Sequence, residues 1–182
     1  MKTYLLRMKA IDECPPRKPV KKIIWSWLGA FLGIYLVAML GQLLTSGLID
    51  HLFLIGSFGA TAVLLYGAPL AEFSQPRNLV GGHVISAWVG VTVFMMIGED
   101  VVLASAMAVS LAIVAMHFTR TLHPPGGATA LIAVIGGPSI HALGYTYVFS
   151  PVFVGALVML VVALLVNNLS RKEDRHYPVY WL

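Results

Sequence analysis

Long apolar stretches without charged residues constrain this chain more than any other feature. A helix that crosses a bilayer needs about 20 such residues, and several stretches reach or approach that length. A soluble domain carries about 25% charged residues, whereas only 11% of the 182 residues here are charged and 58% are hydrophobic. The mean hydropathy is +0.83. The sequence therefore predicts an all-α integral membrane protein. Intrinsic disorder needs the opposite composition, and a disulfide scaffold needs more than the single Cys14.

Six apolar runs follow one another along the chain, and two of them are short or interrupted. The runs are Ile23–Leu44, Leu52–Ala68, Leu79–Ile97, Val101–Phe118, Gly126–Gly136 and Tyr147–Val166. The second run contains Gly56 and Gly59. The fifth follows a Pro-Pro-Gly-Gly stretch that we expect not to form regular helix, because proline lacks the amide N–H. The two short runs either cross the membrane or re-enter it, and we favour six crossings.

Most Lys and Arg residues lie in the two tails. Basic segments beside apolar spans stay on the cytoplasmic side, so we expect both termini in the cytoplasm and the protein in the inner membrane. The tails carry no aromatic platform or recognisable nucleic-acid module, so no nucleic-acid partner is expected. The chain divides into an N-terminal tail, two membrane repeats and a C-terminal tail, at residues 1–22, 23–97, 98–170 and 171–182.

The charges of the loops favour the six-crossing topology. With six crossings, the loops that carry Arg77 and Arg120 lie in the cytoplasm, and the loops that carry Glu99 and His141 lie outside. Every loop then obeys the positive-inside rule. With two re-entrant segments, both arginines move to the outside.

A short tract occurs twice. Gly-Ala-Thr-Ala stands at residues 59–62 and again at 127–130, and each copy continues into an apolar run that ends at a proline. Each copy lies in the middle one of three segments. Three segments per half is an odd number, so the halves would have opposite orientations. The predicted fold is two inverted repeats of three hydrophobic segments with a short interrupted helix in the middle of each. The alternative is ordinary small-residue helix packing.

The Pro-Pro-Gly-Gly stretch predicts an anion site inside the membrane. Free backbone N–H groups at a helix start bind anions, proline suits the first helical position, and Gly56 with Ser57 would open a matching helix in the other half. His123 could donate to the anion, carry a proton or cap backbone carbonyls. The alternative is a proline kink satisfied by neighbouring helices. The candidate substrate-binding residues are Ser57, Gly59, Thr61, Arg77, Asn78, His83, His123, Pro124, Pro125, Gly126, Gly127 and Thr129.

Other chemistry finds little support. Arg77 either attracts the anion or anchors a loop at the interface. His117 and His123 lack a Cys partner and any HExxH pattern, so no metal site is predicted. No P-loop or nucleophile motif occurs, so neither a cofactor nor a catalytic residue is expected. The GxxxG motif of Gly29 and Gly33 more readily packs an internal helix than a second subunit, although a homo-oligomer is compatible with it.

At His123-Pro124-Pro125-Gly126-Gly127 and the following Ala-Thr-Ala, the sequence resembles the HPP family of integral membrane proteins. The resemblance extends to the tract at 59–62, to Gln-Pro-Arg-Asn at 75–78 with Gly-His at 82–83, and to Tyr-Pro-Val-Tyr-Trp at 177–181. That family is described as four-spanning and transport-related. Its chloroplast and cyanobacterial members resemble nitrite transporters, which implies nitrite as the leading substrate.

The expected function is a transporter or channel for a small inorganic anion, bound near the bilayer midplane at the starts of the two interrupted helices. Two alternatives belong to other classes. An intramembrane enzyme would use His123 with Glu99 or Asp100, and a membrane scaffold or regulator would use an exposed tail surface. The sequence does not separate a channel from a carrier.

Overall fold

The computed structural model describes residues 13–44, 53–169 and 176–182, and every regular element in these ranges is helical. The π-helix η1 (Val63–Gly67) continues α3 (Gly56–Ala62), and the π-helix η3 (Val148–Phe153) leads directly into α8 (Val154–Asn168). In chain order the elements are α2 (Val20–Leu44), α3 (Gly56–Ala62), η1 (Val63–Gly67), η2 (Glu72–Ser74), α4 (Pro76–Ile97), α5 (Val101–Thr119), α6 (Pro124–Ile135), α7 (Pro138–His141), η3 (Val148–Phe153) and α8 (Val154–Asn168).

Within the described ranges, four helical stretches are long and apolar enough to cross a bilayer. They are α2, α4, α5 and the continuous stretch Val148–Asn168 formed by η3 and α8. Their outer surfaces carry large exposed apolar side chains, among them Leu43, Val102, Phe118 and Leu165. Such surfaces suit lipid tails rather than water. The multi-pass, all-helical membrane protein predicted from composition is therefore confirmed.

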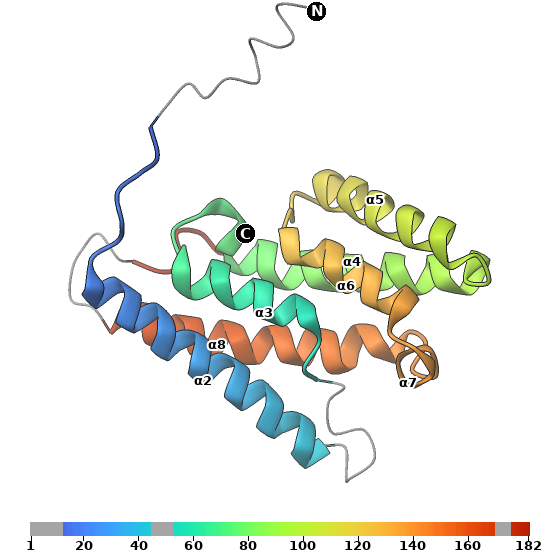
Figure 1. Cartoon of the computed structure of the whole chain (residues 1–182), viewed down its shortest axis with the longest axis horizontal. Coiled ribbons are helices and arrows are strands. Elements are labelled where there is room, and N and C mark those ends of the chain that lie inside the picture. The colour runs from blue at the N-terminus through green and yellow to red at the C-terminus, as the bar shows by residue number, and fades with distance from the viewer. Residues whose placement is uncertain (1–12, 45–52, 170–175) are drawn as a thin grey trace, which may run out of the picture.

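The two short segments lie among the long helices (Figure 1). One runs through α3 and η1 from Gly56 to Gly67, and the other is α6. In Figure 1 the six segments alternate in direction along the long axis, so that each short segment runs opposite to the long helix before it. The 12 residues of α6 form a helix about 18 Å long. That length covers only part of a hydrocarbon core of about 30 Å.

The predicted apolar runs agree with the helix bounds to within a few residues, but one local prediction is wrong. The Pro-Pro-Gly-Gly stretch is the first turn of α6 rather than an irregular approach to it. Its two prolines occupy the positions where a missing N–H costs no helical hydrogen bond. Similarly, α2 already begins at Val20, inside the segment expected to be tail. Leu52, the predicted start of the second run, lies outside the described residues.

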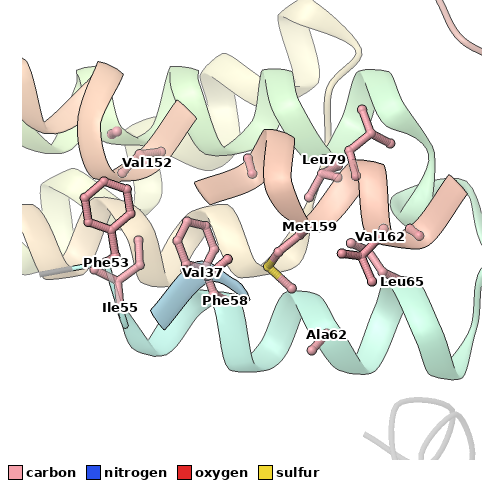
Figure 2. Packing of buried hydrophobic residues seen from close by; sticks show 14 of the residues in the cluster. Val37, Phe53, Ile55, Phe58, Ala62, Leu65, Leu79, Val152, Met159 and Val162 are labelled. Carbon is pink, nitrogen blue, oxygen red and sulfur yellow. The ribbon is translucent and has the colours of Figure 1, made fainter. Parts of the chain in front are cut away.

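Buried apolar side chains join the α3–η1 segment to α8 (Figure 2). Phe58 of α3 and Met159 of α8 are fully buried in this core. The Tyr66 ring of η1 packs on the GxxxG motif of α2, where a Cβ added to Gly29 would lie 2.6 Å from the ring. The Tyr66 hydroxyl donates to the carbonyl oxygen of Met159 at 3.1 Å. The predicted internal packing of the motif is thus confirmed.

Small residues bring α4, α5 and α6 together in a second packed region. Ala104, Ala108 and Ala112 share one face of α5 and are fully buried. A Cβ added to Gly90 of α4 would lie 2.5 Å from the carbonyl oxygen of Ala130 in α6. Close backbone approach of this kind holds helices together in lipid, where the hydrophobic effect does not. It fixes α6 against α4.

The loops form two groups at opposite ends of the bundle (Figure 1). The start of α2, the η2 loop, the α5–α6 turn and the C-terminal segment lie toward one end, and the α4–α5 turn and α7 lie toward the other. Arg77 and Arg120 belong to the first group, while Asp100 and His141 belong to the second. This grouping agrees with the predicted separation of the loops.

Candidate functional site

Six polar side chains are completely buried where α3, α4 and the start of α6 meet. Each of them is 0% exposed. Polar and ionisable groups are expensive inside a membrane protein, and they tend to mark a functional site. We call this group the buried cluster. It comprises Ser57 and Thr61 of α3, His83 and Ser86 of α4, His123 immediately before α6, and Thr129 within α6.

His83 contacts the two threonines that occupy the same position in the repeated tract. Its Nε2 lies 2.7 Å from Oγ1 of Thr61, and its Nδ1 lies 2.7 Å from Oγ1 of Thr129. A neutral imidazole donates at one nitrogen and accepts at the other. The ring is therefore held at both nitrogens by hydroxyls that can complement either tautomer. Three of the predicted site residues are brought together here.

His123 is held by the η2 loop, which contains Phe73 and lies at the same end of the bundle as the α5–α6 turn. Its Nδ1 lies 2.7 Å from the carbonyl oxygen of Phe73. A carbonyl only accepts, so Nδ1 carries the proton and donates. Its Nε2 lies 3.1 Å from Oγ1 of Thr61, which also lies 3.0 Å from the carbonyl oxygen of Ser57. The two imidazole rings meet edge to face with their centroids 4.8 Å apart. Thr61 is thus the shared partner of both histidines.

Two hydroxyls of the buried cluster, Ser57 Oγ and Ser86 Oγ, have no hydrogen-bond partner among the described residues. Leaving a buried polar group unpaired costs about 1–3 kcal/mol. A group enclosed by the cluster could recover that cost by accepting a hydrogen bond. Ser86 lies beside Gly126 of α6, where an added Cβ would stand 2.6 Å from the serine Oγ. The absence of a Cβ at Gly126 therefore lets the Ser86 hydroxyl lie directly against the α6 backbone.

The start of α6 presents fewer free amides than the sequence suggested. Pro124 and Pro125 have no N–H, and the Gly126 amide donates to the carbonyl oxygen of His123 at 2.7 Å. Pro124 is exposed, and so is Gly59 in the other tract. Side chains, rather than a row of backbone N–H groups, supply most of the donors that face the cluster.

Arg77 and Asn78 hold the neighbouring turn, and their hydrogen bonds do not involve the buried cluster. The Arg77 guanidinium donates to the carbonyl oxygen of Thr119 at 2.9 Å. Asn78 Nδ2 donates to the carbonyl oxygen of Leu122 at 2.9 Å. Both side chains fix the α5–α6 turn to the start of α4. A Cβ added to Gly127 would lie 3.7 Å from Val109 Cγ1, which is an ordinary van der Waals contact.

The C-terminal segment, residues 176–182, is hydrogen-bonded to the loop that contains Phe73. The Tyr177 hydroxyl donates to the carbonyl oxygen of Ser74 at 2.8 Å, and the Val179 amide donates to Gln75 Oε1 at 2.8 Å. Burial raises the pKa of the Tyr177 hydroxyl, so this donor stays protonated. Nothing in the chemistry of the tail sequence indicated this role. The tail therefore reaches the cluster indirectly, through the loop that fixes His123.

Sequence reasoning missed two residues at the site. Ser86 stands three positions after His83, and residues at that spacing share a face of a helix. This pair of polar residues in an apolar run was a usable signal. Tyr147, whose hydroxyl donates to the carbonyl oxygen of Thr129 at 3.2 Å, carried no local signal, because only the fold brings it to α6.

The chemistry of the buried cluster is that of hydroxyls and imidazoles. Nowhere in the described ranges do three or more His, Cys, Asp or Glu side chains gather as a metal site would require. Asp100, which the sequence offered as a partner for His123, caps α5 instead. One of its carboxylate oxygens accepts from the Leu103 amide at 3.0 Å.

Comparison with known proteins identifies the family. The family model of the HPP transmembrane region matches residues 15–178. Two similar proteins of Dictyostelium discoideum, each named as a transmembrane protein, are 46% identical over 181 residues and 44% identical over 174 residues. The matches cover 98% and 93% of this chain but 57% and 59% of those proteins, so the chain spans less than two thirds of their length. No solved structure matches. The chain belongs to the HPP transmembrane family.

Proposed function

We propose that this protein carries a small inorganic anion across the membrane and binds it in the buried cluster. The observation that carries the proposal is the pair of unpartnered hydroxyls, Ser57 Oγ and Ser86 Oγ, beside two imidazoles at the meeting point of the short segments. Hydroxyl and imidazole N–H groups stabilise a negative charge. No carboxylate of a described residue is hydrogen-bonded to the cluster, so the cluster holds no paired negative charge that would oppose an anion.

The arrangement of the segments supports an inverted-repeat transporter. In such proteins the substrate site lies near the midplane, where interrupted helices from the two halves meet. Here the two copies of the Gly-Ala-Thr-Ala tract supply Thr61 and Thr129, which contact opposite nitrogens of one histidine. The alternating directions of the six segments support six crossings, with the two short segments completing each half.

The burial of the cluster favours a carrier over an open channel. All six side chains are 0% exposed, so an ion reaches them only when a surrounding element moves. Alternating access, in which one half rocks against the other, provides that movement. Nitrite is the leading substrate. The resemblance to nitrite transporters suggests it, and its two oxygens are acceptors for the donors in the cluster.

The direct test is anion flux into vesicles that contain the purified full chain. Uptake of nitrite, nitrate, chloride and formate would be compared with uptake by protein-free vesicles of the same phosphatidylcholine and phosphatidylglycerol composition. We expect nitrite uptake well above the protein-free rate. Absence of protein-dependent flux for every anion would overturn the proposal.

A serine variant tests the site itself. Ser86→Ala removes a hydroxyl that has no partner in the described part of the chain, so the fold should lose no stability while nitrite uptake falls. The matched control is Ser110→Ala on α5, because the Ser110 hydroxyl is exposed and bonds only its own helix. Wild-type uptake by Ser86→Ala would remove this hydroxyl from the ion path.

In the proposed orientation the protein lies in the inner membrane and both tails lie in the cytoplasm. Single cysteines at Glu72 and His141, in a Cys14→Ser background, would be labelled on whole cells with an impermeant thiol reagent. Glu72 is a suitable position because its side chain is exposed in the loop. We expect labelling at position 141 and none at 72, and the reverse pattern would contradict the orientation.

A further inference from the structure

We propose that His83 and His123, bridged by Thr61, take up one proton together with the anion, so that the protein is a proton–anion symporter. This inference rests on the proposed function and adds a second, cationic substrate to the same site. It depends on the charges around the buried cluster and on the hydrogen bonds within it.

The buried cluster contains no fixed positive charge that could balance an anion. A small anion alone would leave a net negative charge inside an apolar bundle, which is costly. One proton on the histidine pair makes the loaded site neutral. The other charged or titratable side chains on the elements around the pair have other partners or are exposed; they are Tyr66, Glu72, Arg77, His117, Arg120, Tyr147, Tyr177 and Tyr180.

In the neutral cluster, one set of proton positions gives every ring nitrogen of the two histidines a hydrogen-bond partner. His123 Nδ1–H donates to the Phe73 carbonyl, so His123 Nε2 needs a donor, and the Thr61 hydroxyl is the one within reach. Thr61 Oγ1 must then accept from His83 Nε2–H, and His83 Nδ1 accepts from the Thr129 hydroxyl. All the donors point the same way along this chain of four groups, from Thr129 to the Phe73 carbonyl.

The same atoms accommodate one added proton without losing a partner. A proton that joins His123 Nε2 makes that ring an imidazolium, which donates to Thr61 Oγ1 and to the Phe73 carbonyl. The Thr61 hydroxyl turns to the Ser57 carbonyl at 3.0 Å. One proton is gained, no other bond to hydrogen is broken, and the charge of the cluster rises by one. The ring centroids are only 4.8 Å apart, so two positive rings would repel each other, and the pair carries a single proton.

The coupling is tested by accumulation of nitrite in the vesicles described above. With the membrane potential clamped at zero, an interior one pH unit more alkaline should drive one-to-one symport to about tenfold accumulation. Protein-free vesicles correct for passive entry of nitrous acid, and initial rates separate the two routes. His83→Gln and His123→Gln should lose protein-dependent accumulation, while His117→Gln, changed at an exposed histidine of α5, should behave as wild type.

The outcomes separate the two proposals. Nitrite flux that follows membrane potential and ignores the pH gradient would overturn proton coupling and leave anion transport standing. Absence of flux for every anion would overturn anion transport and the coupling with it.

A second measurement on the wild-type protein is independent of variant folding. The chain has six histidines, and ¹⁵N-histidine spectra of the full chain in nanodiscs report the protonation of each ring. We expect His123 as the Nδ1–H tautomer and His83 as the Nε2–H tautomer without ligand. Saturating nitrite should convert one ring of this pair to imidazolium. Two neutral rings at saturating nitrite would overturn the proposal.

Discussion

Thr61 and Thr129 occupy equivalent positions in the repeated tract, yet the structure predicts unequal costs for removing their hydroxyls. Thr61 Oγ1 lies within hydrogen-bond distance of both imidazoles, at 2.7 and 3.1 Å, whereas Thr129 Oγ1 contacts one imidazole at 2.7 Å. Valine keeps the shape and the β-branching of threonine and replaces the hydroxyl with a methyl group. The comparison therefore isolates the hydrogen bonds of each side chain.

The expected magnitudes follow from the number of imidazole partners lost. A side-chain hydrogen bond between membrane helices contributes about 0.6 kcal/mol on average and up to about 1.7 kcal/mol. Thr129→Val should therefore lower the free energy of unfolding by about 0.6–1.7 kcal/mol, and Thr61→Val by about 1.2–3.4 kcal/mol.

The assay is unfolding of the purified full chain by SDS in mixed micelles, followed by the fluorescence of its four tryptophans. Thr92→Val is the control, because the Thr92 hydroxyl bonds its own helix and Tyr145 on an exposed face. Its cost should not exceed that of one hydrogen bond. A Thr61→Val protein no less stable than Thr129→Val would refute Thr61 as the shared partner of both histidines.

Three further predictions follow from individual contacts. Gly126→Ala should cost about 1–3 kcal/mol of stability in the same unfolding assay, because its Cβ would lie 2.6 Å from Ser86 Oγ. Gly127→Ala, at a neighbour where an added Cβ would make only an ordinary contact with Val109 at 3.7 Å, should be neutral or stabilising by up to about 1 kcal/mol. Equal costs for the two variants would contradict the packing of α6 on α4. Tyr177→Phe should increase hydrogen exchange in the Ser74 loop, and unchanged exchange would argue against the tail holding it. Because burial raises the pKa of Tyr177 above its ordinary value of 10.0, its contribution is complete below pH 10 and is lost as the pH rises through the folded-state value. Unfolding measured above pH 10 should therefore show a smaller loss of stability for Tyr177→Phe than for wild type.

Much of the fold was readable from the sequence because the forces that set it are local. Long apolar runs must become helices in lipid, where every backbone polar group needs a partner within its own segment. That rule was enough to predict the membrane class and, to within a few residues, all six segments. The expectation that the Pro-Pro-Gly-Gly stretch lies outside regular helix was wrong, because Pro124 and Pro125 occupy the first turn of α6, where a missing N–H costs no helical hydrogen bond.

The candidate site was readable only in part. His83, His123, Thr61 and Thr129 were predicted from residue chemistry and the repeated tract, and the structure brings them into one cluster. For Arg77 the sequence left two readings open, attraction of the anion or anchoring of a loop, because a sequence does not show which acceptor a charged side chain will contact. The structure directs that side chain to Thr119.

The sequence by itself determined that this protein lies in a membrane, where its helices run, and which polar residue types are available for a site. Each of these depends on the residues of a single segment. Tertiary structure alone decided which nitrogen meets which hydroxyl and that the C-terminal segment holds the Phe73 loop. It also decided that the Ser57 and Ser86 hydroxyls have no hydrogen-bond partner among the described residues. Those relations join α3, α4, α6 and the tail across 22 to 103 positions of the chain. The packing of small residues between helices sets such distances, and no local pattern encodes them.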